Sequence, residues 1–286
     1  MSISHAKQDK SKVLFYDDFS SSELDRSIWN ARVTGKTVND EQQAYIDSPE
    51  TIYLSENTED ETTSSGGILA LHPRYRKDFQ TSEGKRFDFI SGRIDTRNKF
   101  EFRYGTASAR MRLPVGKGFW PAFWAMGNEK WPQAGEIDIM ENIGDSDWIS
   151  GGIHGPGYFG EQALINQSYL TSPGDITHWH IYSVEWYPNS FLFRVDGNLY
   201  FRVTKDTVKF FGKWVFDDPK YLILNLAIGG KYPYKINHVN EPYYGVPCQT
   251  VEIIKKDQAR VLIDWVQVTK NDFTINGPEI VEEHQI

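Results

Sequence analysis

Hydrophobic and polar residues alternate along most of this chain, and that pattern is typical of β-strands rather than helices. Residues 180–204, HIYSVEWYPNSFLFRVDGNLYFRVT, hold three such runs separated by the turn sequences YPNS and DGN. FEFRYGTASARMRLP (100–114) alternates as well, whereas KYLILNLAIGG (220–230) and RVLIDWVQVTK (260–270) are continuous apolar runs of strand length. Many short strands joined by turns predict an all-β sandwich.

Helical periodicity is weak, and the best helix candidate is VPCQTVEIIKKDQ, residues 246–258. Neither a repeat nor a Gly/Ser-rich linker divides the chain, so the sequence predicts one domain over residues 1–286. We interpret the polar stretch 54–67 as a loop of that domain and residues 1–12 as a disordered N-terminal tail.

Composition limits the partners. A net charge of −8 argues against nucleic acid and anionic membranes and fits a neutral substrate better. Buried aromatic residues explain part of the 14% aromatic content, and aromatic platforms for a ligand would explain the rest. Cys248 is the only cysteine, so an internal disulfide and a cysteine-based metal site are excluded. Residues 1–12 lack the apolar run of a signal peptide, so either a signal was removed or the protein stays in the cytoplasm. We expect a monomer.

The segment GEIDIMENIGD, residues 135–145, carries acidic residues among large apolar ones. Glu136 and Asp138 share one face of the predicted strand, whereas strict alternation sends Glu141 to the apolar face. A buried carboxylate without a partner costs several kcal/mol. We therefore predict a β-bulge at Ile139–Met140, which resets the alternation and brings all three acids to one face.

Crowded carboxylates repel one another, so at least one of their pKa values should rise. A retaining glycosidase needs one ionised nucleophile and one protonated acid, with carboxyl groups about 5–5.5 Å apart. Alternate positions on a strand face lie roughly 6.6 Å apart at Cα, so Glu136 and Glu141 meet only if both lean inward over Asp138. The alternatives from the pattern alone are an exposed acidic strand or a Ca²⁺ site.

With GKGFWPAFWAMG (116–127) before it and HGPG (154–157) after it, this segment resembles glycoside hydrolase family 16, and most of all its laminarinase-like (endo-β-1,3-glucanase-like) members. The resemblance implies a concanavalin A-like β-jelly-roll sandwich of two antiparallel sheets with a concave substrate cleft. It also implies that Glu136 is the nucleophile, Asp138 an assisting acid and Glu141 the general acid/base. The resemblance further implies a secreted or periplasmic protein.

Sugar rings present apolar C–H faces that stack on aromatic rings. The resemblance implies that Trp120 and Trp131 line the sugar sites beside the nucleophile. We expect Trp124, Trp186 and Trp265 to pack in the core instead.

Four more residues are substrate-binding candidates by the resemblance. His154 is expected near the acid/base or the +1 sugar, Asn225 against the −1 sugar, and Asn39 and Arg93 in the minus subsites. The alternatives are a structural role for His154, a hydrogen-bonded amide in a buried strand for Asn225, and a turn cap or a surface charge for Asn39 and Arg93.

Asp18 and Asp264 would be unusual as unpaired acids in terminal strands. The resemblance implies that they bind a structural Ca²⁺, a cation that prefers oxygen ligands, and an ordinary salt bridge is the alternative. We expect no organic cofactor and no catalytic metal.

The chain departs from the resemblance after NLAIGG, where residues 231–260 form an insertion with a short helix and several tyrosines. Loops on a rigid scaffold often change specificity. We predict an endo-acting retaining β-glycanase for β-1,3 (or β-1,3/1,4) linkages of a neutral polysaccharide such as laminarin. A β-galactan-directed hydrolase, a transglycosylase and a non-catalytic carbohydrate-binding protein are the alternatives.

Overall fold

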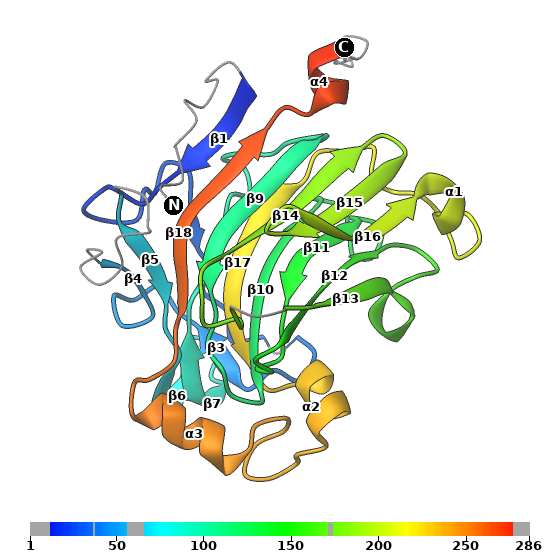
Figure 1. Ribbon diagram of the computed structural model, residues 1–286. Helices are drawn as coiled ribbons and strands as arrows, with labels where there is room; N and C mark the ends of the chain where they lie inside the picture. Colours follow the sequence, from blue (N-terminus) through cyan, green and yellow to red (C-terminus); the bar gives the residue numbers. More distant parts are fainter. Residues whose placement is uncertain (1–11, 37, 56–65, 171–173, 277–286) are drawn as a thin grey trace.

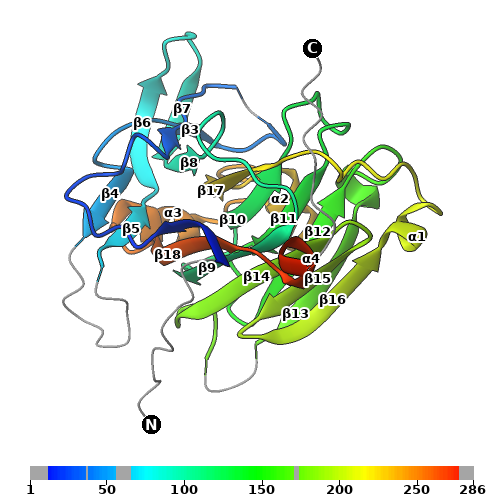
Figure 2. The same ribbon diagram turned by 90° about the horizontal axis from the view of Figure 1, so that it is seen from above.

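Two antiparallel β-sheets packed face to face form the body of the protein (Figures 1 and 2). The computed structural model describes residues 12–36, 38–55, 66–170 and 174–276. The expected N-terminal tail, apart from its last residue, and most of the expected loop at 54–67 lie outside the described residues.

The first sheet is named the β10–β17 sheet after its central strands. Its hydrogen-bonded order is β13 (Leu164–Tyr169), β12 (Trp148–His154), β11 (Glu136–Glu141), β10 (Phe119–Met126), β17 (Tyr221–Ile228), β8 (Arg93–Asp95) and β2 (Asn30–Ala31).

The second sheet is named the β9–β18 sheet. Its order is β16 (Asn198–Thr204), β15 (Ser190–Val195), β14 (His180–Tyr187), β9 (Gly105–Arg112), β18 (Val261–Thr269), β5 (Ile68–Leu71) and β4 (Ile52–Ser55), with β1 (Val13–Asp17) paired to β18.

A small third sheet joins β3 (Gln43–Tyr45), β7 (Arg86–Ser91) and β6 (Arg74–Gln80), with β3 parallel to β7. The all-β jelly-roll sandwich expected from the sequence is confirmed. The three alternating runs of residues 180–204 form β14, β15 and β16, and the two apolar runs form β17 and β18.

The core lies between the two large sheets and is filled by alternate side chains of each strand. On β11, Ile137, Ile139 and Met140 are at most 1% exposed and belong to the same apolar cluster as Trp186 of β14. Full burial of such a side chain contributes about 1.5–3 kcal/mol. The core therefore determines which face of β11 its acidic residues occupy.

The helices are short and lie at the edges of the sandwich. α1 (Lys205–Val208) follows β16 at the outer edge, and α4 (Asp272–Asn276) follows β18 (Figure 1). α2 (Lys231–Asn237) and α3 (Cys248–Lys255) both belong to the 231–260 insertion and lie at one end of the sandwich. α3 falls within the stretch predicted to be helical. In the described part of the chain, no helix has the length and apolar character to cross a bilayer.

Candidate active site

β11 contains the predicted β-bulge. Asp138 pairs with Trp124 of β10, and the next pair joins Met140 to Phe123, so Ile139 has no partner on β10. The pairing of β11 with β12 shifts in the same interval, between residues 138 and 141. One extra residue is thus present in β11 relative to both neighbours.

The bulge sends both of its residues into the core and returns Glu141 to the face of Glu136 and Asp138. We call this outward face of the β10–β17 sheet the site face. It also carries Trp120 and Trp124, because these residues alternate on β10 with the fully buried Phe119 and Phe123. An acidic row flanked by indole rings results.

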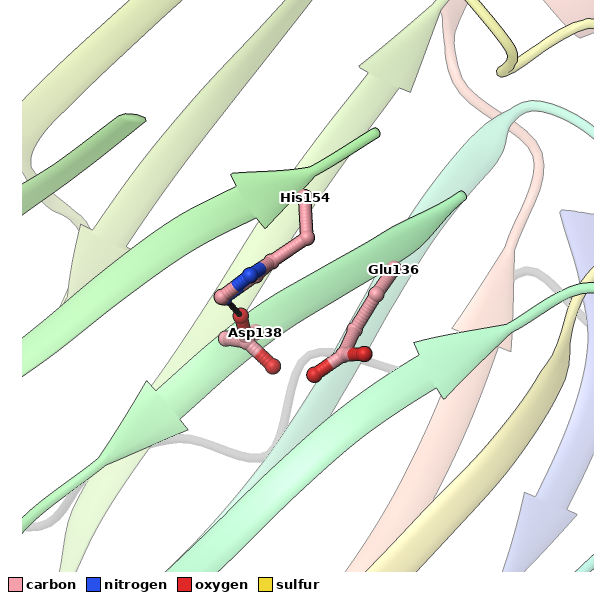
Figure 3. Close-up of side chains that lie close together, drawn as sticks. All are labelled: Glu136, Asp138 and His154. Carbon is pink, nitrogen blue, oxygen red and sulfur yellow. Dashed lines mark ion pairs between the residues drawn. The ribbon is translucent and has the colours of Figure 1, made fainter. Parts of the chain in front are cut away.

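Figure 3 shows the carboxylates of Glu136 and Asp138 side by side on β11, with the ring of His154 pointing at Asp138 from β12. His154 Nε2 lies 3.0 Å from Asp138 Oδ2, and Asp138 is only 3% exposed. Carboxylate oxygens of Glu136 and Asp138 lie within 4.8 Å of each other, and this closeness favours a proton shared between the two groups.

An indole N–H donates to each glutamate of the site. Trp131 Nε1 donates to Glu136 Oε2 over 2.7 Å, and Trp120 Nε1 donates to Glu141 Oε1 over 2.8 Å. Trp120 and Trp131 therefore contact the two acids directly and fix where each carboxyl group points.

Burial dominates the electrostatics of the three acids. It raises the pKa of Glu136 to about 8, with the charge of Asp138 adding to the rise and His154 and the Trp131 N–H opposing it. Burial and the charge of Glu141 raise the pKa of Asp138 well above its ordinary value. Burial also raises the pKa of Glu141, while the Trp120 N–H lowers it. The site thus retains protons at a pH where exposed carboxyl groups have lost them.

A hydrogen-bond chain runs beside the acids and fixes Trp124. Its indole N–H donates to Asn225 Oδ1 over 2.7 Å, and Asn225 Nδ2 donates to the Tyr45 hydroxyl over 3.1 Å. The Tyr45 hydroxyl donates in turn to Glu41 Oε2 over 3.5 Å. An indole can only donate and a carboxylate can only accept, so the two ends set the direction of the whole chain.

The remaining sequence-derived candidates lie around this chain. The guanidinium of Arg93 stacks over the Trp124 ring at 4.9 Å from its centroid. The Asn39 side chain is exposed, and its backbone oxygen accepts the N–H of Lys231 at the start of α2. The structure thus brings Arg93 and Asn225 together at Trp124, with Asn39 on a neighbouring loop.

Two of the three tryptophans expected in the core are not there. Trp186 is fully buried as predicted, but Trp124 is half-buried on the site face. Trp265 is half-buried on the outer side of β18, because a second bulge between Ile263 and Trp265 resets the alternation of that strand. Alternation along β10 places Trp124 on the face of Trp120, so the expectation of core packing was wrong there, whereas periodicity does not reveal the bulge at Trp265.

Sequence reasoning also did not single out Glu41, Tyr45 or Tyr232 as site residues. Tyr232 belongs to α2 and packs edge to face against Trp120 at 5.5 Å between ring centroids. Burial and the charge of Glu141 raise its pKa to about 12. The tyrosine content of the insertion was the one sequence signal for this contact.

Glu136, Asp138 and His154 are the one group of His, Cys, Asp and Glu residues in the described chain that could jointly hold a metal ion, with ligand atoms within 4.8 Å of one another. At the terminal strands, Asp264 is 1% exposed and pairs with Arg110 Nη1 over 2.7 Å, and Asp18 accepts the N–H of Ser20. A guanidinium therefore balances the charge of Asp264.

Comparison with known proteins gives one family. Residues 55–240 match the family model of the glycosyl hydrolases family 16. Over 245 residues the chain is 29% identical to glucan endo-1,3-β-glucosidase A1 of Niallia circulans, which covers 77% of this chain and 34% of that protein. Over 177 residues it is 29% identical to keratan-sulfate endo-1,4-β-galactosidase of Sphingobacterium multivorum, which covers 59% of this chain and 41% of that protein. The chain thus spans less than half the length of either relative.

Among solved structures, the laminarinase catalytic domain of Thermotoga maritima MSB8 is similar over its whole length. The TM-score is 0.75 at 31% identity, covering 91% of this chain and 98% of that domain. The likeness therefore includes both large sheets and the strands that carry the acids.

Proposed function

This chain belongs to the glycosyl hydrolases of family 16, and from that premise we propose that it is an endo-acting retaining β-glycanase. Its proposed substrate is a neutral β-glucan of the laminarin type, cleaved at internal β-1,3 (or β-1,3/1,4) linkages. The observation that carries the proposal is the bulge in β11, which sets Glu136, Asp138 and Glu141 on one face.

In the first step a carboxylate oxygen of Glu136 attacks the anomeric carbon. The glycosidic C–O bond breaks, its electron pair stays on the departing oxygen, and that oxygen takes the proton of Glu141. In the second step a water molecule gives its proton to Glu141 and attacks the same carbon, and the bond to Glu136 breaks. Two displacements leave the anomeric configuration unchanged.

We assign the shared proton of the Glu136–Asp138 pair to Asp138. Asp138 is the more deeply buried of the two, so its ionisation costs more, whereas the Trp131 N–H stabilises a negative Glu136. This assignment gives the site an ionised nucleophile and a protonated Glu141 at the same pH. Carboxyl groups and water then supply the nucleophiles and the protons of both steps, so no organic cofactor or catalytic metal is required.

Half-buried indole rings supply the surface for the sugars. Trp120 and Trp124 flank the acids on β10, and Trp131 leaves 41% of its surface exposed beside Glu136. Pyranose rings stack their C–H faces on such rings. Both polar atoms of the Asn225 side chain are hydrogen-bonded, one to Trp124 and the other to Tyr45. Besides any contact with a sugar, Asn225 therefore holds the Trp124 indole in place.

The galactosidase relative favours a β-galactan as the alternative substrate, and the 231–260 insertion supports it because Tyr232 of α2 reaches Trp120. Transglycosylation, in which a sugar hydroxyl replaces water, would use the same residues. A purely binding protein would need the indole surface but not three acids in a row beside it.

A substrate screen separates these functions. Purified protein is assayed on laminarin, mixed-linkage glucan, β-1,3-galactan and agar, with the Glu136→Gln variant as control. We expect hydrolysis of laminarin with net retention in the NMR spectrum of the first products, and loss of that activity in the variant. Near-full activity of Glu136→Gln, or inverted products, would overturn the mechanism. Activity on galactan alone would replace the substrate and leave the mechanism standing.

The proposal includes a structural Ca²⁺ at Asp18 and Asp264. Their oxygen atoms suit that ion, but the guanidinium of Arg110 already balances Asp264, so the fit of the ion is poor. Metal analysis of purified protein, with melting curves before and after chelation, tests whether calcium is bound at these residues. Absence of bound calcium and an unchanged melting temperature would rule out the ion at these residues.

A further inference from the structure

Four strongly exposed aromatic side chains lie on three loops, the first between β10 and β11 beside Glu136, the second after β12 and the third after α1. Trp131 and Phe159 are each 41% exposed, Phe211 is 52% exposed and Phe210 is 88% exposed. Phe210 is the most exposed of the large hydrophobic residues in the described chain. We call these four residues the aromatic strip. Grouped apolar exposure of this kind marks a binding surface more often than chance.

The aromatic strip begins at the nucleophile. Trp131, whose N–H donates to Glu136, meets Phe159 edge to face at 5.2 Å between ring centroids. Phe159 lies in the loop that follows His154, the last residue of β12, so its position depends on the strand beside the acids. A ligand that covers Trp131 therefore touches Phe159 next.

The loop after α1 is fastened to the Phe159 loop. Lys213 donates its backbone N–H to the Pro156 oxygen over 3.0 Å, and the Tyr158 hydroxyl donates to the Lys213 oxygen over 2.9 Å. At Gly157, which has φ +94°, an added Cβ would stand 2.3 Å from the Phe211 oxygen, so only glycine allows the loops to approach this closely. The two loops thus present Phe210 and Phe211 at a fixed place.

We propose that the aromatic strip extends the substrate-binding site and holds a stretch of the polysaccharide chain beyond the reacting sugars. The inference rests on the proposed function, because its occupant is the same polymer. Each exposed ring offers a stacking surface for one pyranose unit. Trp131 and Phe159 are in ring contact, and the loop of Phe210 and Phe211 is hydrogen-bonded to the loop of Phe159. Short substrates that fill only the site face do not reach Phe210 and Phe211.

Other occupants fit less well. An acidic protein with a net charge of −8 is repelled by anionic membranes and nucleic acids, whereas a neutral polysaccharide is not. A second copy of the chain would bury the same rings, and its presence would show as concentration-dependent self-association.

The test measures binding without turnover. All proteins carry Glu136→Gln, and the double variant Phe210→Ala/Phe211→Ala is compared with this parent. Tyr16→Ala serves as matched control, because Tyr16 is an aromatic residue of 43% exposure on β1 in the opposite sheet. Calorimetry measures the affinity for the long polysaccharide hydrolysed in the screen and for a short oligosaccharide of the same linkage, and melting curves verify folding.

We expect the double variant to bind the long chain roughly tenfold more weakly, from the loss of two stacking contacts, and the short chain as the parent does. The control should match the parent on both. Equal affinity of parent and double variant for the long chain would overturn the inference and leave the proposed function intact. The inference would also be overturned if sedimentation showed that the parent is a dimer and the double variant a monomer, while both bind the polysaccharide equally well. A parent that binds none of the polysaccharides would remove the proposed function and this inference with it.

Discussion

His154 Nε2 lies 3.0 Å from Asp138 Oδ2, while Nδ1 of the same ring accepts the backbone N–H of Gly160 over 3.1 Å. A backbone N–H can only donate, so the neutral ring carries its proton on Nε2, the nitrogen that faces Asp138. The loop after β12 thereby orients the acid that sits between the two glutamates.

His154→Ala should lower kcat by about 10- to 100-fold with a smaller change in KM, because a misplaced Asp138 disturbs the reacting geometry more than sugar binding. His154→Gln, whose amide still offers a donor, should recover part of the loss. Steady-state kinetics of the three proteins is the measurement. A rise in KM at unchanged kcat would instead assign His154 to substrate binding.

Glu136→Gln should stabilise the folded protein at alkaline pH. The folded Glu136–Asp138 pair keeps one proton, assigned above to Asp138, up to about pH 8, far above the ordinary glutamate value of 4.5. The native protein therefore binds more protons than the unfolded chain between these values. Stability from this pair is complete below 4.5 and is lost as the pH rises toward 8. Removing the Glu136 carboxyl group should add about 1–2 kcal/mol near pH 8 and little near pH 4. Melting temperatures of both proteins at the two pH values test this, and a constant difference between them would contradict it.

Deleting Ile139 should abolish the site and weaken the fold. Without the extra residue, either Glu141 enters the core or the apolar face of β11 turns outward, and each outcome costs several kcal/mol. Ile139→Val, which keeps the bulge and shortens one side chain, should cost only about 0.5–1.5 kcal/mol and retain activity. Denaturant unfolding and laminarin hydrolysis of both variants provide the comparison. An active, stable deletion variant would show that the bulge does not position Glu141.

Trp124→Phe should weaken sugar binding without changing the chemical step. A smaller aromatic ring remains but the indole N–H is lost, so Asn225 Oδ1 loses a donor in a site where that amide is only 7% exposed. We expect a loss of about 1–3 kcal/mol of stability and a raised KM with kcat little changed. Trp186→Phe, in the core between the sheets, controls for loss of an indole away from the site. A fall in kcat alone would contradict a binding role for Trp124.

The sequence predicts the sandwich and the acidic row for a physical reason. Alternation reports burial directly, and a glutamate at position 141 is incompatible with a regular strand, so the bulge follows from the cost of a buried charge. The same reasoning failed at Trp265, because Asp264 accommodates a second bulge that periodicity does not reveal.

Contacts between distant segments are the part that periodicity cannot supply. The hydrogen-bond chain from Trp124 through Asn225 and Tyr45 to Glu41 joins residues far apart in the sequence. The sequence around each of them does not indicate that they meet. Tyr232 likewise reaches Trp120 only because α2 follows the end of β17 that lies beside the start of β10. Such a site depends on strand order, which alternation does not encode.

The most direct test of the account identifies the residue that bonds to the sugar. In Glu141→Ala, an activated aryl glycoside of the substrate needs no acid to depart, while the missing base slows hydrolysis of the intermediate. Mass spectrometry of the digested protein should then find the glycosyl group on the peptide of β11, attached at Glu136. A glycosyl group on any other residue, or product formation without any covalent intermediate, would contradict the assignment.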